Sequence, residues 1–583
     1  MSLKNKGRTR TRSVIFKVLS WVFGIPLALI AIAALACVWL HATADLGEPE
    51  FVPSQVPVVQ VNDSLRRWGS SSLRIDPDGL YEMRVCGGPF ERGEAIGKLG
   101  ADLLYQQEKA FADKLFEMVP SSRYRAFLHY FITIFNRRLG ASVPLEYRQE
   151  IKAMSASCTH EFDDFGSPYE RQMQYHSAHD IGHVMQDYML VGCTSFAVWG
   201  KESADSSLLM ARNFDFYMGE EFAKNKLVLF EKPDSGYAYV SVTWPGMLGV
   251  VSGMNTQGLA VTINASKLEV PSSSATPISI LVKSILQYAS NIEEAETIAA
   301  SFKTFVCESI LVGSANDGRA VVIEKTPSAM GIYSPEGCSE SSRMTVASSA
   351  NMVSSLGGAS SVTRIICTNH YQSDRFRDDP VNVENIRVSD SGYRYRRVQQ
   401  LLDSLGSIDY LKAAAVLRDI RGVDGEDVGY CNDLSINQML AMHSVIFKPA
   451  EKKIWVSTSP WQFGKFVCFD LDEVFCDAGF SDDELSIPAD KFLETEAFRN
   501  VLKFKAMQLT LATASKSRRE VPADSLALFV SLNPSYYGTY VSVASYLESL
   551  GKNAEADEYY RRALTCPMKL SERQHLETRL RGR

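Results

Sequence analysis

The sequence predicts an α+β protein in which a block of strands and helices lies between two mainly helical segments. Before Cys193, apolar residues recur at helical spacing. After Cys193, short β-prone runs separated by turn residues surround two helical stretches, and from about Asp490 the chain is helical to its end. Strands, then helices, then strands again are typical of a layered body whose sheets are covered by helices.

The N-terminal region, residues 1–44, is predicted to be a membrane anchor or a signal. An uncharged apolar run extends from Val18 to Leu40 and follows a cluster of basic residues: Lys4, Lys6, Arg8, Arg10, Arg12 and Lys17. About 20 apolar residues cross a bilayer as a helix, and a basic flank favours the cytoplasmic side. Ala42-Thr43-Ala44 leaves a cleaved signal peptide as the alternative. In both cases the body is predicted to be exported, either periplasmic or extracellular.

Length, net charge and cysteine content limit the kinds of protein that this chain can be. A chain of 583 residues exceeds one hydrophobic core, so two or three folded units are expected. The net charge of −7 argues against a nucleic-acid surface, which normally carries a basic excess. Eleven scattered cysteines allow one or two disulfides but do not indicate a disulfide scaffold.

The segments before Cys193 are predicted as a linker and a helical unit. Residues 45–80 are rich in Pro, Ser and Val without clear periodicity and are interpreted as a linker. Residues 81–192 are predicted to be mainly helical, with helices over Glu91–Met118, Ser122–Leu139 and Tyr169–Leu190.

Residues 193–490 are predicted to form the strand-rich body. Strands are expected at Thr194–Trp199, Leu208–Ala211, Leu227–Phe230, Tyr237–Trp244, Gly249–Ser252, Leu259–Asn264, Ser309–Val312 and Ala320–Glu324. Two helices are expected between them, over Pro277–Ser290 and Ile292–Ser301.

Residues 491–583 are predicted to be a helical extension. Its spacing of small and apolar residues resembles one tetratricopeptide-type helix pair: Ala544, Leu547, Gly551, Ala556, Tyr560 and Ala563, followed by Pro567. One repeat cannot bury its apolar face alone, so we expect it to pack on neighbouring helices.

Gly192-Cys193 stands where helical character gives way to the first β-run. A free thiol with a pKa of about 8.5 is only a few per cent thiolate at pH 7, so a cysteine nucleophile needs a base. Cleavage after Gly192 would expose an α-amine with a pKa of about 8 on the same residue as the thiol. That amine can take the thiol proton, and glycine before the cut leaves the attacked carbonyl unhindered.

Polar motifs follow in order downstream of this junction. Arg212-Asn213-Phe214-Asp215 places an arginine and a carboxylate at the end of a strand, and Asn264 ends the run Met254–Asn264. Cys367-Thr368-Asn369-His370-Tyr371 offers a second amide, and the run Ser391–Arg397 opens a helix with Arg394 in it. Each residue alone fits a surface ion pair or a turn cap. Their joint order favours catalysis.

Together these residues resemble the acyl-coenzyme A:6-aminopenicillanic acid acyltransferase (isopenicillin N acyltransferase) family of N-terminal nucleophile hydrolases. Conjugated bile acid hydrolases and penicillin V acylases are related to it. The resemblance extends from about Tyr81, where Gly87-Gly88-Pro89-Phe90-Glu91-Arg92-Gly93 looks like the family's entry motif, to about Trp461. It implies a four-layer αββα sandwich over residues 193–490, no cofactor, and a precursor segment (81–192) that stays bound after cleavage.

The resemblance also implies a role for each residue. Cys193 would be the nucleophile and, through its freed amine, the base. Asp215 would hold that amine, and Arg212 would favour the thiolate. Asn264 would donate to the oxyanion, Asn369 would orient the amine or the substrate, and Arg394 would complete the charge network.

Three histidines remain outside this set: His176, His179 and His183. His-Asp-x-x-His at 179–183 superficially resembles a zinc-protease helix, but Asp stands where Glu is needed and no third ligand is assignable. We expect no metal here and assign these histidines to packing or substrate binding.

The sequence therefore predicts an autoproteolytically activated N-terminal cysteine amidase or acyltransferase that acts through an acyl-enzyme on linear amides, namely N-acyl compounds of the penicillin or bile-acid conjugate type. Two alternatives stay open. One is a papain-like hydrolase that uses His370 or His443 as base without chain cleavage. The other is an anchored interaction protein with an inactive core.

Overall fold

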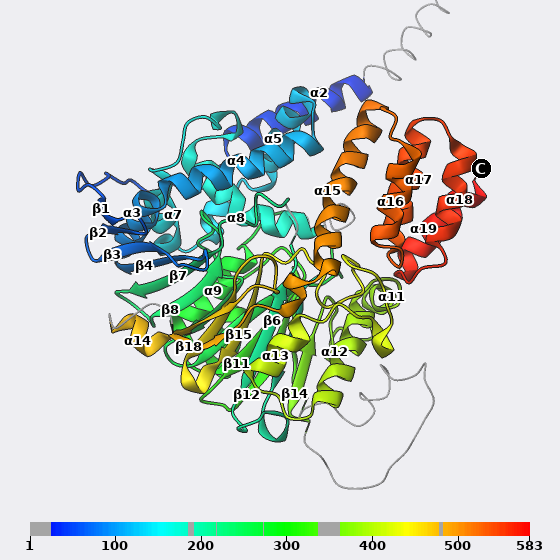
Figure 1. The fold of residues 1–583 in the computed structure, drawn as a ribbon. Coiled ribbons are helices and arrows are strands. Elements are labelled where there is room, and N and C mark those ends of the chain that lie inside the picture. The colour runs from blue at the N-terminus through cyan, green and yellow to red at the C-terminus, as the bar shows by residue number, and fades with distance from the viewer. Residues whose placement is uncertain are drawn as a thin grey trace, which may run out of the picture.

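The computed structural model describes residues 25–184, 192–216, 219–271, 273–335, 362–476 and 482–582. Figure 1 shows an α+β body of two sheets, with helices on their outer faces and a helical block formed by the C-terminal residues beside them. The sheets have 11 and 7 strands, in the orders β1-β2-β3-β4-β7-β8-β9-β10-β11-β12-β13 and β14-β5-β6-β15-β16-β17-β18.

The N-terminal part contributes both strands and helices. Its elements are α2 (Ile25–Ala42), β1 (Val59–Asn62), β2 (Leu65–Trp68), β3 (Ser71–Ile75), β4 (Tyr81–Gly87), α3 (Pro89–Leu99), α4 (Ala101–Met118), α5 (Ser122–Phe135), α6 (Leu139–Ser142), α7 (Leu145–Ser155) and α8 (Pro168–Val184). The predicted helix over 91–118 is two helices, because the chain breaks at Gly100. Residues 185–190 of the predicted helix over 169–190 lie outside the described residues.

The prediction that residues 45–80 are only a linker is wrong. Residues 59–75 form β1, β2 and β3, which extend the large sheet from β4. These strands have only four or five residues: β1 alternates apolar and polar residues over just four positions, and β2 carries Arg66 and Arg67 in its middle, so none gives a clear strand pattern. Their stability comes from pairing with the next strand, which local sequence does not reveal.

The predicted membrane helix is not supported. Residues 18–24 of the apolar run lie outside the described residues, and Ile25–Ala42 form α2. Within the part of the chain that the structure describes, no helix has the length and apolarity needed to cross a membrane.

The strand-rich body begins at β5 (Thr194–Val198). Its further strands are β6 (Leu209–Phe214), β7 (Leu227–Pro233), β8 (Tyr239–Thr243), β9 (Ser252–Asn255), β10 (Leu259–Ala265), β11 (Glu308–Ser314), β12 (Arg319–Lys325), β13 (Met330–Tyr333), β14 (Arg364–Cys367), β15 (His443–Lys448), β16 (Lys453–Ser457), β17 (Phe466–Asp470) and β18 (Asp482–Ile487). Its helices are α9 (Ile278–Tyr288), α10 (Ile292–Ser301), α11 (Pro380–Val388), α12 (Ser391–Leu405), α13 (Tyr410–Leu417) and α14 (Leu471–Phe475).

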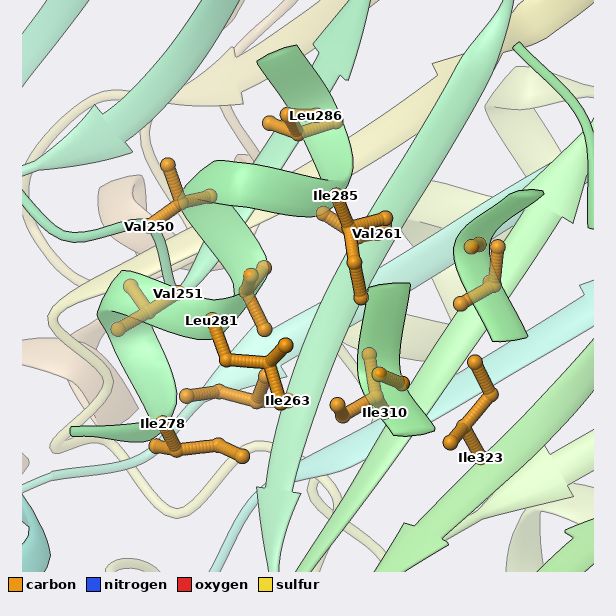
Figure 2. Packing of buried hydrophobic residues seen from close by; sticks show 14 of the residues in the cluster. Val250, Val251, Val261, Ile263, Ile278, Leu281, Ile285, Leu286, Ile310 and Ile323 are labelled. Carbon is orange, nitrogen blue, oxygen red and sulfur yellow. The ribbon is translucent and has the colours of Figure 1, made fainter. Parts of the chain in front are cut away.

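Alternation along the strands builds four layers. Between the two sheets, Val240 and Leu311 of the large sheet share a buried cluster with Met210 and Val445 of the small one. On the other face of the large sheet, Val261, Ile263 and Ile310 pack against α9, as Figure 2 shows. The outer face of the small sheet is covered by α12 and α13. Successive residues therefore face opposite layers, which gives the order helix, sheet, sheet, helix.

The N-terminal part and the strand-rich body share one sheet. β4 pairs in parallel with β7, from Tyr81 opposite Leu227 to Gly87 opposite Pro233. The segment before Cys193 is therefore joined to the body by main-chain hydrogen bonds as well as by a shared apolar cluster.

The C-terminal block comprises α15 (Glu496–Ser517), α16 (Ala523–Leu532), α17 (Tyr537–Ser549), α18 (Asn553–Ala563) and α19 (Leu570–Arg581). The helix pair expected from the tetratricopeptide-type spacing is α17 and α18, with Ala544, Ala556 and Tyr560 buried between helices. The block contacts the loop 427–440, where Lys569 forms an ion pair with Asp433 at 2.9 Å.

Candidate active site

The Gly192–Cys193 junction lies at the head of β5 in the small sheet. Cys193 is buried, with 1% of its surface exposed, and is followed by Thr194, the first residue of β5. The Gly192 N–H donates to the main-chain oxygen of Asp215 at 3.2 Å. Because β5 pairs with β6 on one side and β14 on the other, the junction is held by an inner strand of the sheet.

Arg212 places a cation beside the thiol. It lies in β6, opposite Ser195 of β5, and its Nη2 is 3.6 Å from Cys193 Sγ. Nη1 donates to the Val251 oxygen and to Ser252 Oγ, each at 2.6 Å. Burial raises the pKa of the Cys193 thiol, and the guanidinium of Arg212 opposes that rise. Arg212 therefore reduces, without cancelling, the cost of forming the thiolate in this buried site.

The Asp215 carboxyl group is fully buried. It follows β6, and its main-chain oxygen lies 3.9 Å from Cys193 Sγ. Among the residues that the structure describes, neither carboxylate oxygen finds a hydrogen-bond partner. Burial raises the pKa of this carboxyl to about 8, although Arg394 and Arg212 act to lower it. An orphaned buried carboxylate is costly and calls for a functional explanation.

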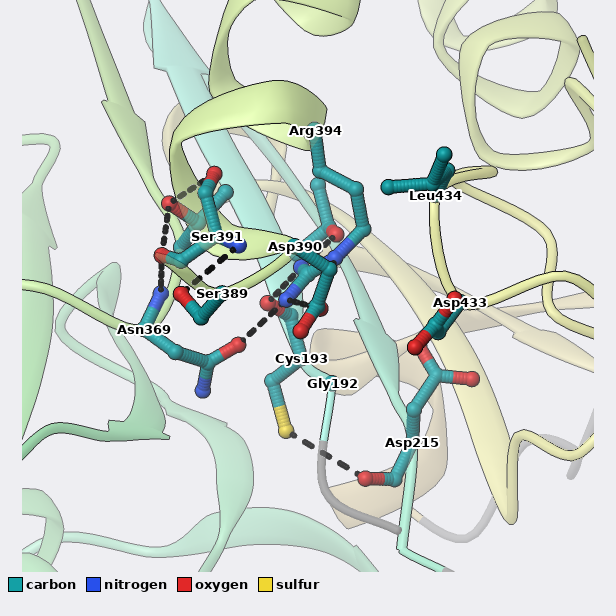
Figure 3. A network of polar contacts seen from close by, with 12 residues as sticks. Gly192, Cys193, Asp215, Asn369, Ser389, Asp390, Ser391, Arg394, Asp433 and Leu434 are labelled. Carbon is teal, nitrogen blue, oxygen red and sulfur yellow. Dashed lines mark hydrogen bonds and ion pairs between the residues drawn. The ribbon is translucent and has the colours of Figure 1, made fainter. Parts of the chain in front are cut away.

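Arg394 ties the predicted residues together (Figure 3). From α12, its Nη1 donates to the Cys193 oxygen and to Thr194 Oγ1, both at 2.7 Å. Its Nη2 donates to Asn369 Oδ1 at 2.7 Å, and Asp390 Oδ2 accepts from Nε at 2.9 Å. Asn369 is anchored in turn through Nδ2, which donates to the Ala265 oxygen.

Asn264 lies near the junction, but its amide points elsewhere. Its Nδ2 donates to the oxygens of Cys367 and Thr368 at 2.8 and 3.2 Å. Its Oδ1 accepts from Ser195 Oγ at 3.3 Å, two residues along β5 from the nucleophile. The structure therefore brings Asn264 to the strand that carries Cys193 without directing its amide at the thiol.

Sequence comparison identifies the part of the chain that carries most of these residues. Residues 201–459 match the family described as acyl-coenzyme A:6-aminopenicillanic acid acyl-transferase. The matched segment, which is less than half of the chain, is similar to that family. Arg212, Asp215, Asn264, Asn369 and Arg394 all lie in the acyl-transferase family segment, whereas Cys193 precedes it by eight residues.

Individual relatives are distant. A protein of Archaeoglobus fulgidus described as uncharacterized is 24% identical over 425 residues, which are 66% of this chain and 65% of that protein. The chain therefore spans slightly less than two thirds of that relative's length.

Solved structures show similarity over about half of the chain. A Caenorhabditis elegans N-acylethanolamine-hydrolyzing acid amidase ortholog is 17% identical, covers 44% of this chain and 93% of its own, and has a TM-score of 0.30. A mutant conjugated bile acid hydrolase from Clostridium perfringens is 15% identical, with 48% and 93% covered and a TM-score of 0.30. Penicillin V acylase from Agrobacterium tumefaciens is 14% identical, with 48% and 87% covered and a TM-score of 0.29.

The histidines do not contact the thiol in the described structure. His176 lies in α8, where Nδ1 lies 2.7 Å from the Gln172 oxygen and Nε2 accepts from the Leu248 N–H at 3.0 Å. Burial lowers its pKa to about 4, so it packs as a neutral ring. The side chains of His179 and His183 lie outside the described residues. No three His, Cys, Asp or Glu side chains in the described ranges lie close enough to hold a metal.

The two histidines of the papain-like alternative are committed to other partners. His370 Nδ1 lies 2.8 Å from Ser391 Oγ, and His443 Nε2 lies 2.9 Å from Ser252 Oγ. In the part of the chain that is described, the contacts of Cys193 Sγ are with Arg212 and Asp215.

Two residues of the acyl-transferase family segment were missed by the sequence analysis. Asp390 binds Arg394 from four residues earlier on the same helix, a spacing that the sequence does offer. Gln438 Nε2 donates to the Gly192 oxygen at 2.9 Å across 246 residues of sequence, and no local pattern signals that contact.

Ten cysteines are described, and none of these ten forms a disulfide. A cavity of about 810 Å³ lies along α15 and α17, and none of the predicted site residues lines it. The polar network around Cys193, and not this cavity, is therefore the candidate active site.

Proposed function

We propose that this chain is an N-terminal cysteine amidase or acyltransferase that activates itself by cleavage between Gly192 and Cys193. The buried carboxylate of Asp215 carries this proposal, because neither of its oxygens is paired within the described residues although it lies next to the junction. Cleavage would create an ammonium group on Cys193 that can pair with it. Pairing with that ammonium would favour the ionised form of Asp215, whose carboxyl oxygens have no hydrogen-bond partner within the described residues of the uncleaved chain.

Cleavage supplies the base as well as the nucleophile. The freed amine of Cys193 has a pKa of about 8, so a substantial fraction is neutral near pH 7. It accepts the thiol proton as Sγ attacks a carbonyl carbon. Arg212, 3.6 Å from Sγ, stabilises the thiolate that results.

Turnover then follows two balanced steps. Sγ adds to the amide carbonyl, the C–N bond breaks, and the leaving amine takes the proton that the α-amine held. The thioester is attacked by water or by a second amine, and the Cys193 thiol is restored. Hydrolysis and acyl transfer thus share one acyl-enzyme. The match to an acyl-transferase family supports this reaction class. The two steps as written need no cofactor.

The substrate we propose is a small linear N-acyl amide. Asn264 remains the proposed oxyanion donor, although its amide is occupied by the oxygens of Cys367 and Thr368 in the uncleaved chain. Its role therefore requires the end of β14 to shift after cleavage. Arg394 donates to the main-chain oxygen of Cys193 and to Asn369 Oδ1, so Asn369 orients the arginine that fixes the direction of the nucleophile.

We also propose that the N-terminal segment stays bound after cleavage. The parallel pairing of β4 with β7 supports this, as does the buried contact of Arg92 with Glu231 at 3.3 Å. These contacts cross the cleavage point and bury charge that separation would expose.

The N-terminal basic residues and apolar run support export of the body, which we propose on sequence grounds alone. Fractionation of cells expressing a tagged chain tests it: recovery with the cytosol would contradict export.

The test of the function uses a chromogenic N-acyl anilide and three proteins: wild type, Cys193→Ala, and the control Cys468→Ala, which removes a buried cysteine of β17. Removing a nucleophile typically costs about 10⁴-fold or more in turnover. We expect such a loss for Cys193→Ala and none for Cys468→Ala. Turnover by Cys193→Ala within tenfold of wild type would refute the proposed nucleophile.

A further inference from the structure

The carbonyl group of Gly192 has a side-chain donor directed at its oxygen. Gln438 Nε2 donates to that oxygen at 2.9 Å. The Gln438 side chain is buried, with 3% of its surface exposed, so the hydrogen bond is shielded from water. In the proposed self-cleavage this same carbonyl carbon is the one attacked.

The present position of the Gln438 amide depends on residue 192 having no side chain. A Cβ added to Gly192 would lie 2.4 Å from Gln438 Nε2, 2.8 Å from Oε1 and 3.0 Å from Cδ. The first two distances are shorter than real Cβ contacts, and the third is at the limit. The amide group therefore lies directly against the Gly192 Cα, and any larger residue would push the donor away from the carbonyl.

The loop 427–440 holds Gln438 in this place. The Met439 N–H donates to Asn437 Oδ1 at 3.0 Å, and Ser435 Oγ donates to the Asn437 oxygen at 2.9 Å. Met439 is fully buried and shares an apolar cluster with Phe463 and with Val501, which belongs to α15. Lys505, also of α15, donates to the Met439 oxygen at 3.0 Å. Asn437 and Met439, which precede and follow Gln438 in the sequence, are thus held in place by the loop and by the C-terminal block.

We infer that Gln438 is a catalytic residue of the self-cleavage, the donor that stabilises the oxyanion formed at Gly192. The inference rests on the proposed function. Sγ of Cys193 bonds to the Gly192 carbonyl carbon, the carbonyl oxygen takes the negative charge, and the thiol proton passes to the Cys193 nitrogen. The C–N bond then breaks to give a thioester. Water hydrolyses the thioester, which leaves the Gly192 carboxylate and the free thiol.

The donor acts because charge develops on the oxygen it already touches. A preorganised hydrogen bond in a buried site is stronger to an oxyanion than to a neutral carbonyl, so it lowers the barrier. Asn264 does not compete for this role in the uncleaved chain, because its amide donates to Cys367 and Thr368. Self-cleavage and substrate turnover therefore use different amide donors.

The test follows cleavage of the full chain in cell-free translation, sampled over time on denaturing gels. Gln438→Met keeps the length of the side chain and removes the donor, and we expect cleavage to slow by about 100- to 1,000-fold. The matched control is Gln462→Met, since Gln462 is equally buried and its side-chain amide makes no hydrogen bond within the described residues. That control should cleave at the wild-type rate.

Two further variants keep the inference falsifiable. Gly192→Ala should also slow cleavage, because its methyl group displaces Gln438. Gln438→Leu also removes the donor, so it decides the outcome if Gln438→Met does not unfold cooperatively. Cleavage of a folded Gln438 variant within threefold of wild type would overturn the inference. A wild-type chain that never cleaves would refute the proposed function instead, so the two failures are distinguishable.

Discussion

Two buried groups of charges in this molecule differ in how far they are paired. The ion cluster consists of Arg92, Glu150, Glu231 and Lys283, from α3, α7, β7 and α9. Its two cations and two carboxylates contact one another at 2.8 to 3.3 Å. The junction site consists of Gly192, Cys193, Arg212, Asp215 and Arg394, and there the Asp215 carboxylate has no partner within the described residues.

Their electrostatics differ accordingly. In the ion cluster, Lys283 and Arg92 outweigh burial at Glu150 and lower the pKa of its carboxyl to about 2, whereas burial and the neighbouring Glu150 raise the pKa of Glu231 to about 7. Burial raises the pKa of Asp215 to about 8, because two arginines in its vicinity do not compensate for lost water. A buried carboxylate that contacts cations has a structural role. A buried carboxyl group that lacks a partner within the described residues is a candidate for binding one.

The largest expected effect on stability comes from the ion cluster. Lys283→Met leaves two buried carboxylates with one cation, and breaking a buried ion pair this way costs about 3–5 kcal/mol. Denaturant unfolding should show this loss, while turnover per folded molecule stays at the wild-type level. As a control, Lys109→Met at an exposed ion pair should change neither quantity. A loss below about 1 kcal/mol for Lys283→Met would show that the cluster does not support the fold.

A smaller and opposite effect is expected at Asp215. Its folded pKa of about 8 exceeds the unfolded value, so the folded chain holds the proton more tightly and stability falls as pH rises from about 4 to 8. In a Cys193→Ala background, Asp215→Asn removes this loss. Relative to Asp215, the variant should gain up to about 1.4 kcal/mol per pH unit in that range. Unfolding midpoints measured at pH 5, 6 and 7 test this, and a gain independent of pH would contradict the assigned pKa.

The smallest expected effect is on turnover, and it compares a residue of the junction site with one near the ion cluster. Ser252 Oγ accepts from Arg212 Nη1 at 2.6 Å and lies 2.9 Å from His443 Nε2. Ser252→Ala removes one hydrogen bond to a cation, worth about 1.5 kcal/mol, so kcat should fall about tenfold with a smaller change in KM. Ser284→Ala, which removes a hydroxyl beside Tyr147 near the ion cluster, should affect stability and spare kcat. Equal turnover for the two variants would argue against positioning of Arg212 by Ser252.

Local patterns predicted the elements that are stabilised locally. The strands from β5 to β12, α9 and α10 lie within a few residues of their expected positions, because each alternates or repeats its own apolar residues. β1 to β3 were missed because four- and five-residue strands carrying arginines depend on pairing with β4.

The candidate site was also predicted only in part, because some of its contacts depend on distant segments of the chain. The order of the motifs brought Cys193, Arg212, Asp215, Asn369 and Arg394 into one hypothesis, and the structure places them around one junction. The direction of the Asn264 amide and the contact of Gln438 with Gly192 depend on the close approach of distant loops. Such contacts have no periodicity or spacing by which a single sequence could reveal them.

The central claim is that the thiol and its base reside on one residue freed by cleavage. Intact-mass analysis of the purified full chain, wild type beside Cys193→Ala, tests it most directly. We predict two associated fragments for wild type, one beginning at Cys193, and a single uncut chain for Cys193→Ala. A wild-type preparation that hydrolyses N-acyl amides while its Gly192–Cys193 bond remains intact would contradict the account.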